Sequence, residues 1–168
     1  MEQFRRIWNR IRRGVVYALL LLVFWLLQVV ILSHITVLGV HAVIMPALVV
    51  AVGLFEGGWR GGMFGLAAGI ICDLSYTTPT VLFTVLFPIF GFVEGFLTEF
   101  LINRRFYAYF VSAAGALMIS GVLSMMRLLL SQPDSRAALW GSCITQVLLA
   151  LPFAVAAYYA CLAVPRRD

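Results

Sequence analysis

The chain alternates long apolar runs with short polar links. A helix needs about 20 mainly apolar residues to cross a bilayer, and several of the runs reach or approach that length. The predicted membrane-spanning helices cover residues 15–32, 38–55, 60–73, 81–102, 106–130 and 139–164. The pattern therefore predicts an all-α fold, a polytopic membrane bundle of six transmembrane helices.

Composition supports a membrane protein, because 63% of the residues are hydrophobic and only 11% are charged. The mean hydropathy of +1.02 lies far from that of soluble domains. A length of 168 residues suits one membrane domain over residues 1–168. Within it we expect a basic cytoplasmic segment at 1–14, the six-helix bundle at 15–164 and a cytoplasmic tail at 165–168.

The charge distribution predicts the orientation of the bundle. All twelve basic residues are arginine, and only Arg127 and Arg136 fall on the predicted outer side. The ten predicted inner arginines are Arg5, Arg6, Arg10, Arg12, Arg13, Arg60, Arg104, Arg105, Arg166 and Arg167. Positive residues mark the cytoplasmic side, so both termini are predicted to be cytoplasmic. The arginines are topology anchors that meet membrane lipid, and they do not indicate nucleic-acid binding.

Small residues recur every four positions in two of the predicted helices. Positions four apart share one helix face, and small residues let membrane helices approach closely. The predicted helix-packing or partner-binding residues are Gly57, Gly61, Gly65 and Gly69, with Asp73 next in the series, and the shorter stripe Gly91 and Gly95. Generic packing within the bundle and contact with a partner helix are both consistent with this pattern.

Among the charged residues within or near the predicted spans are Asp73, Glu94 and Arg127. A charge in a membrane helix costs about 2.5–3.5 kcal/mol and normally faces the protein interior, water or a partner. Asp73 lies close to a probable helix end, so a structural ion pair or cap and a functional role are both open for it. We predict that Asp73 and Arg127 pair at the outer end, with Arg127 reaching the outer headgroups as the alternative. Glu94 is predicted to be an interior hydrogen-bonding residue.

Motifs of membrane enzymes are missing from the sequence. It contains neither a His-Glu-x-x-His zinc motif nor the Gly-x-Gly-Asp of intramembrane aspartyl proteases. His34 and His41 are seven residues apart, with no cysteine or acidic residue nearby to complete a metal site. We therefore predict a protein without catalytic residues, metal or cofactor.

The stretch from Gly61 to Leu74, Gly-Gly-Met-Phe-Gly-Leu-Ala-Ala-Gly-Ile-Ile-Cys-Asp-Leu, resembles the glycine-spaced span of MreD, the rod shape-determining membrane protein of bacteria. This resemblance implies a non-enzymatic scaffold of the cell-elongation machinery in the bacterial cytoplasmic membrane, supporting lateral peptidoglycan synthesis. The implied partners are MreC and, indirectly, MreB, RodA and its partner transpeptidase. The implied site residues are Gly61, Gly65, Gly69 and Asp73.

The alternative function is the substrate-binding S subunit of an energy-coupling-factor vitamin transporter, which is similar in size and helix number. Asp73, Tyr76, Glu94 and Arg127 could supply polar groups to a ligand cavity. Such subunits tend to carry an alanine-rich docking motif in the first helix, where this chain has only Ala18. A small-molecule ligand is therefore not the favoured prediction.

Overall fold

The computed structural model describes residues 2–32, 43–75, 81–100, 106–131 and 136–164, and side chains within 12–30, 43–75, 81–99, 106–123 and 144–164. Every element in these ranges is helical. The helices are α1 (Glu2–Leu26), η1 (Leu27–Leu32), α2 (Met45–Glu56), α3 (Gly58–Ser75), α4 (Leu82–Phe100), α5 (Phe106–Ser131) and α6 (Arg136–Leu162). The predicted all-α fold is confirmed.

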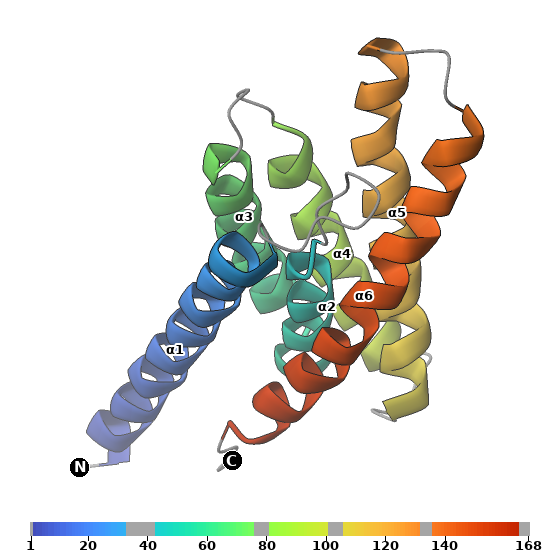
Figure 1. Ribbon diagram of the computed structural model, residues 1–168. Helices are drawn as coiled ribbons and strands as arrows, with labels where there is room; N and C mark the ends of the chain where they lie inside the picture. Colours follow the sequence, from blue (N-terminus) through green and yellow to red (C-terminus); the bar gives the residue numbers. More distant parts are fainter. Residues whose placement is uncertain (1, 33–42, 76–80, 101–105, 132–135, 165–168) are drawn as a thin grey trace.

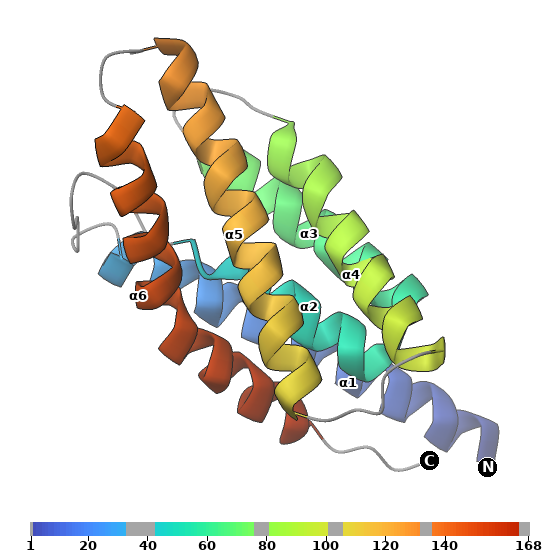
Figure 2. The same ribbon diagram turned by 90° about the vertical axis from the view of Figure 1, so that its right-hand side faces the viewer.

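Helices α1 to α6 run in alternating directions, so the start of α1 and the end of α6 lie at the same end of the bundle (Figures 1 and 2). α2 occupies the middle, α3 and α4 lie beside it, and α5 pairs with α6 on the other side (Figure 1). α1 is inclined to the others and packs on them less closely. The fold is thus a central helix with two helical pairs and one loosely attached helix around it.

Four helices in the described ranges are long and apolar enough to cross a membrane. The qualifying windows are Arg12–Val30, Leu82–Glu99, Phe106–Leu123 and Ile144–Leu162. α2 is apolar but only 12 residues long, and α3 is not among the four. A membrane helical bundle follows directly from these helices, and its precise number of spans depends on α2 and α3.

α2 forms the core of the bundle. Every residue from Met45 to Phe55 is buried, so the helix is covered on all sides by its neighbours. The sequence predicts a longer run interrupted by Pro46, but the helix instead begins at Met45 with Pro46 in its first turn. Proline is tolerated there because the first turn has no internal partner for that N–H group. Pro46 therefore starts this helix rather than kinking it.

The start of α2 is stabilised by a side chain from η1. Gln28 Oε1 accepts hydrogen bonds from the backbone N–H groups of Ile44 at 3.1 Å and Met45 at 3.3 Å. Its Nε2 group donates to Cys72 Sγ of α3 at 3.8 Å. A buried helix start needs such acceptors because its first N–H groups have no partner within the helix.

The helix that contains the first predicted span begins well before residue 15. α1 runs without a break from Glu2 to Leu26 and continues as a π-helix to Leu32, and the cytoplasmic location of the basic segment stays a prediction. Gly14 has the poorest helix propensity of residues 2–32, and one glycine costs only about 1 kcal/mol. The basic segment therefore continues the first membrane helix.

Tyr109 joins three helices at the buried interface of α2, α5 and α6. Its hydroxyl lies 3.1 Å from the carbonyl oxygen of Ala47 and 2.8 Å from that of Ala154. Its ring is fully buried and packs on Tyr158 with ring centroids 5.2 Å apart. The hydroxyl proton can be donated to either carbonyl, which connects the α5–α6 pair to the core helix.

Replacing Tyr109 by phenylalanine should lower the free energy of unfolding by about 1 kcal/mol, because one buried hydrogen bond is lost while the ring is kept. Thermal unfolding of the purified protein in detergent measures the effect. The matched control is Tyr107→Phe, since Tyr107 is 78% exposed on the same helix. Equal effects of the two substitutions would contradict the assigned role of Tyr109.

Candidate helix-packing and partner-binding site

The predicted glycine series begins with a turn. Gly57 links α2 to α3 with φ +89°, a conformation that side chains disfavour. Its N–H donates to Gly53 O at 3.0 Å, and its carbonyl accepts from Gly61 N–H at 2.9 Å. A Cβ atom at Gly57 would meet nothing within 4 Å. Gly57 thus differs from the prediction: it is required by the turn and not by helix packing.

Gly65 and Gly69 bring the backbone of α3 directly against that of α4. A Cβ atom at Gly65 would collide with the Phe87 carbonyl, 2.6 Å from its carbon, and lie 2.9 Å from Pro88 N. A Cβ atom at Gly69 would collide with the Phe83 carbonyl and lie 2.7 Å from Thr84 Cα. These neighbours are backbone atoms and cannot move aside as a side chain would. The glycine face of α3 is therefore filled by α4 of the same chain.

Three glycines from three helices meet at the end of this interface near the α2–α3 turn. A Cβ atom at Gly61 would lie 2.5 Å from Gly53 Cα and 2.7 Å from Gly91 O, and one at Gly53 would lie 2.5 Å from Gly91 O. Gly53 was not among the predicted packing residues. It lies four positions before Gly57, so extending the same series backwards would have found it. The junction holds α2, α3 and α4 together as one closely packed unit.

Gly95 continues the α4 stripe towards the α2–α3 turn. A Cβ atom there would collide with the backbone of Gly57 and Gly58. The two predicted glycine stripes thus face one another across the α3–α4 contact, with Gly95 packed beneath the turn.

Asp73 lies at the other end of α3, where its carboxylate caps the start of α4. Oδ1 accepts from Phe83 N–H at 3.3 Å, and Oδ2 accepts from Thr84 N–H and the Thr84 hydroxyl, both at 2.7 Å. The Asp73 residue is 6% exposed. A carboxylate on the N–H groups of the first helical turn also interacts favourably with the positive end of the helix dipole. Asp73 therefore joins the C-terminal end of α3 to the N-terminal end of α4.

The structure does not bring Asp73 and Glu94 together. About ten residues of α4, or about 15 Å of helix rise, separate Glu94 from the turn that Asp73 caps. Glu94 is 4% exposed and has Ser112 of α5 as its hydrogen-bonding neighbour. The side chain of Arg127 lies outside the described residues, so the pairing of Asp73 with Arg127 stays a prediction.

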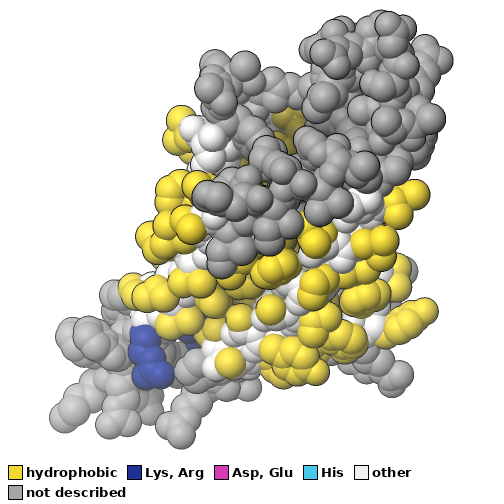
Figure 3. Space-filling view, viewed as in Figure 1, with side chains coloured by type: hydrophobic (Ala, Val, Ile, Leu, Met, Phe, Trp, Pro, Cys, Tyr) yellow, Lys and Arg dark blue, Asp and Glu magenta, His cyan; other side chains and the backbone are white. Residues whose placement is uncertain are grey.

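The opposite face of α3 is exposed and apolar. Its large exposed side chains are Trp59, Met63, Leu66, Ile70 and Leu74. Apolar side chains cover most of the described face of the molecule (Figure 3). Because the glycine face is used inside the bundle, contacts between α3 and another molecule must use this exposed face.

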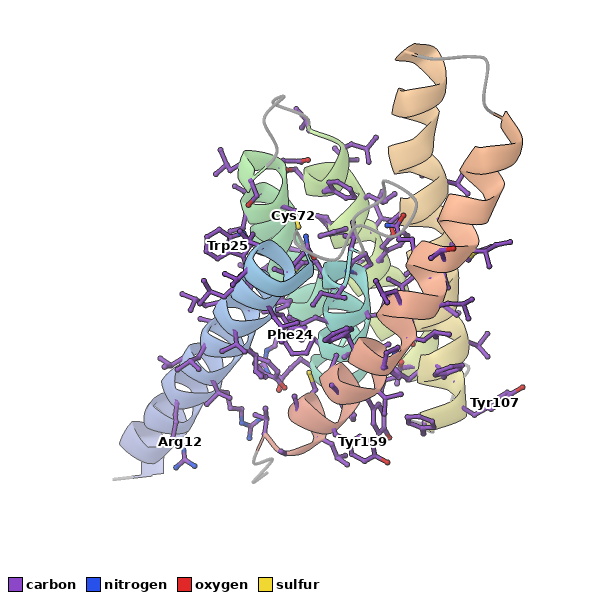
Figure 4. All side chains as sticks on the ribbon, in the orientation of Figure 1. Arg12, Phe24, Trp25, Cys72, Tyr107 and Tyr159 are labelled. Carbon is purple, nitrogen blue, oxygen red and sulfur yellow. The ribbon has the colours of Figure 1, made fainter. Side chains whose placement is uncertain are left out.

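Between α1 and α3 lies an open groove of about 1350 Å³. Trp25 Nε1–H donates to Ser75 Oγ at 2.8 Å at one end, and at the other the Tyr17 hydroxyl donates to Glu56 Oε1 at 3.1 Å. Trp25 lies at the upper part of α1 and Arg12 at its lower part (Figure 4). These contacts join residues 39 and 50 positions apart in sequence, so local patterns could not have predicted the groove.

Comparison of the chain with family models, with curated proteins and with solved structures finds no match. The function proposed below therefore rests on the sequence resemblance and on the geometry.

Proposed function

We propose that this protein is a non-enzymatic membrane scaffold of the bacterial cell-elongation complex, supporting lateral peptidoglycan synthesis as MreD proteins do. The observation that carries the proposal is the Gly61–Asp73 segment, in which Gly61, Gly65, Gly69 and Asp73 hold α3 directly against α4. A scaffold needs a fixed internal frame and external contact surfaces. The frame here is the α2–α3–α4 unit.

Exposed apolar helix faces supply the contact surfaces. α1, α3, α4 and α5 each present several large hydrophobic side chains at the surface of the described structure. The most exposed large hydrophobic side chains of the described structure are Leu74, Tyr107, Trp59, Val81, Met63, Leu148 and Leu19. In a membrane, such faces meet lipid or a partner helix. The proposed partners are MreC and, through it, MreB, RodA and its partner transpeptidase.

The proposed topology has six crossings and two cytoplasmic termini in the bacterial cytoplasmic membrane. α2 is short, but it is buried among the other helices, whereas α3 has 18 residues and one exposed apolar face. Both alternate in direction with their neighbours (Figure 1). Short spans shielded by protein are tolerated at modest cost. Arg12, Arg13 and Arg60 line one end, which the positive-inside rule makes cytoplasmic.

The transporter-subunit alternative draws less support from the groove. Polar side chains of the groove bind one another. Glu56 accepts a hydrogen bond from the Tyr17 hydroxyl, and its Oε2 atom lies 2.6 Å from Arg60 Nη1. The other lining residues are mainly apolar. A vitamin site needs several converging polar groups available to the ligand.

Affinity purification from the native bacterium in mild detergent tests the proposal. We expect mass spectrometry to recover MreC and wall-synthesis enzymes at least about tenfold above a tagged, equally abundant polytopic membrane protein used as control. Recovery of transporter ATPases, or of a vitamin-sized ligand in near-equal stoichiometry, would contradict the scaffold and support the alternative.

A further inference from the structure

We propose that the bundle presents two different hydrophobic widths to the bilayer, so that α3 and α4 bind a locally thinned patch of lipid while α5 and α6 span the full thickness. This inference goes beyond the scaffold function. It uses the proposed topology, in which α3 crosses the membrane, and it does not depend on MreC or on any other partner protein.

Exposed aromatic residues with a polar tip mark one boundary of the membrane. Among the side chains that the structure describes, the exposed tryptophan and tyrosine residues are Trp59, Tyr107 and Tyr159. They lie at the start of α3, the start of α5 and the end of α6, and these helix ends share one end of the bundle (Figures 1 and 2). The exposed Arg12 of α1 lies at the same end (Figure 4). Because tryptophan and tyrosine gather at the level of the lipid headgroups, this end of the bundle lies at a membrane–water boundary.

On the side of α3 and α4, the apolar surface extends only a short distance from this boundary. Leu74 is an exposed apolar residue at the end of α3, fifteen positions after Trp59, which corresponds to about 22 Å of helix rise. α4 gives the same width. Gly95 packs on the first residue of α3, and fifteen positions separate its neighbour Phe96 from the exposed Val81, which directly precedes α4.

Polar groups follow directly at the far end of α3. The helix ends at Ser75, whose hydroxyl oxygen accepts a hydrogen bond from the indole N–H of Trp25 at 2.8 Å. Trp25 lies at the upper part of α1 (Figure 4). The sequence then continues as Tyr-Thr-Thr-Pro-Thr to residue 80. Since hydrocarbon excludes polar and non-helical backbone, the far boundary on this side lies close to Ser75.

On the other side of the bundle, the apolar surface is wider. α5 stays mainly apolar to Leu130, twenty-three positions and about 34 Å beyond Tyr107. α6 begins at Arg136, also twenty-three positions from Tyr159. α4, α5 and α6 lean the same way, and the upper ends of α5 and α6 lie beyond those of α3 and α4 (Figures 1 and 2). A hydrocarbon core of about 30 Å is covered by α5 and α6 but exceeds the width of α3 and α4 by about 8 Å.

A helix that is too short for the bilayer can thin it, draw its polar flanks inward or be covered by another helix. The outer faces of α3 and α4 favour thinning. They carry large apolar side chains such as Met63, Leu66 and Ile70 of α3 and Val85 and Ile89 of α4. The glycines that would let a further helix approach closely are used between α3 and α4 themselves. Acyl chains are therefore the occupant that these faces fit.

Depth measurements on the full chain in vesicles test the proposal. The vesicles consist of phosphatidylcholine with palmitoyl and oleoyl chains. A nitroxide is attached to a single cysteine introduced by Leu74→Cys or Ile144→Cys, with the three native cysteines replaced by alanine. Ile144 is the matched control, because it is exposed on α6 and lies fifteen positions from Tyr159, as Leu74 does from Trp59.

We expect the Leu74 nitroxide to lie about 8 Å closer to the far headgroups than the Ile144 nitroxide, the difference between the bilayer core and the width of α3. It should collide more often with an aqueous nickel chelate than with oxygen dissolved in hydrocarbon, and the Ile144 nitroxide should show the opposite preference. Equal depths at the two positions would overturn the proposal. So would a Leu74 nitroxide that neither reagent reaches, because a second copy of the chain would then cover α3.

Shorter lipid chains provide a second check. In vesicles whose core is about 22 Å thick, the width of α3, the Ile144 nitroxide should move to the headgroup level. The Leu74 nitroxide should keep its environment. A shift of the same size at both positions would contradict the two widths.

A probe in the middle of α3 separates thinning from topology. Leu66 is exposed and lies seven positions after Trp59, so a nitroxide on Leu66→Cys should lie in hydrocarbon if α3 crosses the membrane. A Leu66 nitroxide in water would overturn both the proposed topology and the thinning. Leu66 and Leu74 nitroxides that both lie deep in hydrocarbon would overturn the thinning alone. Co-purification of MreC tests the scaffold separately, so either proposal can fail without the other.

Discussion

Replacing Gly65 by alanine should lower the free energy of unfolding by about 3 kcal/mol, the upper part of the range for overpacking. The new methyl group would meet the Phe87 carbonyl and lie 2.9 Å from Pro88 N, so α3 and α4 would have to separate. In a chain of this size, such a loss corresponds to a fall in the thermal midpoint of about 6–12 °C. Scanning fluorimetry or circular dichroism in detergent measures the midpoint.

Two glycines provide matched controls for this substitution. A Cβ atom at Gly62, on the same helix, would lie 3.6 Å from Pro88 O and 3.7 Å from Phe92 Cβ, which is ordinary contact. A Cβ atom at Gly115 would meet nothing within 4 Å. Alanine at either position should leave stability unchanged or raise it by up to about 1 kcal/mol, because alanine favours helix. A similar loss at all three positions would contradict backbone contact at Gly65.

Replacing Asp73 by alanine should cost about 2–4 kcal/mol, because a helix cap is removed and buried donors lose their acceptor. The affected groups are the N–H of Phe83 and both the N–H and the hydroxyl of Thr84. Asp73→Asn keeps one acceptor oxygen and should cost less than Asp73→Ala. Urea or thermal unfolding of the three proteins in the same detergent gives the order.

A double-substitution cycle with Thr84→Val assigns part of this cost to the predicted contact. Thr84→Val alone removes one hydrogen bond, worth about 1 kcal/mol. In the Asp73→Ala background it should have little further effect, because the hydroxyl has already lost its acceptor. Additive effects of the two substitutions would show that Asp73 stabilises the protein by other contacts.

The sequence could predict the helices and the glycine stripes because both depend on local spacing. The four-residue repeat from Gly61 to Gly69 predicts a packing face, and the Gly91 and Gly95 stripe predicts a second one. Spacing alone could not say which helix fills the α3 face, since small residues serve internal packing and partner contact equally well. The structure places α4 of the same chain on it.

Other features of the structure could not be predicted from the sequence, because they depend on contacts between distant residues or on special backbone geometry. Asp73 caps a helix that begins nine residues later, and its partners are mainly backbone N–H groups, which any sequence has. Gly57 belongs to the glycine series but serves a turn with positive φ. Gln28 was overlooked because an isolated glutamine in an apolar run gives no sign that it caps another helix. A cap was among the roles open for Asp73, but the sequence could not say which helix start it would cap.

The central claim is that the glycine face of α3 is covered by the protein's own α4 and not by a partner. A disulfide tests it, because a Cβ atom at Gly62 would lie 3.7 Å from Phe92 Cβ, within the usual disulfide range of about 3.5–4.5 Å. The substitutions are Gly62→Cys and Phe92→Cys, with Cys72, Cys143 and Cys161 replaced by alanine.

Mild oxidation of this variant in native membranes, followed by maleimide-polyethylene glycol labelling and gel electrophoresis, reports the bond. The account predicts that most of this variant becomes resistant to labelling while still migrating as a single chain. In a control variant with Gly62→Cys and Val93→Cys, the two thiols should stay largely reduced and should be labelled. Free thiols at positions 62 and 92, or bonds formed only between chains, would contradict it.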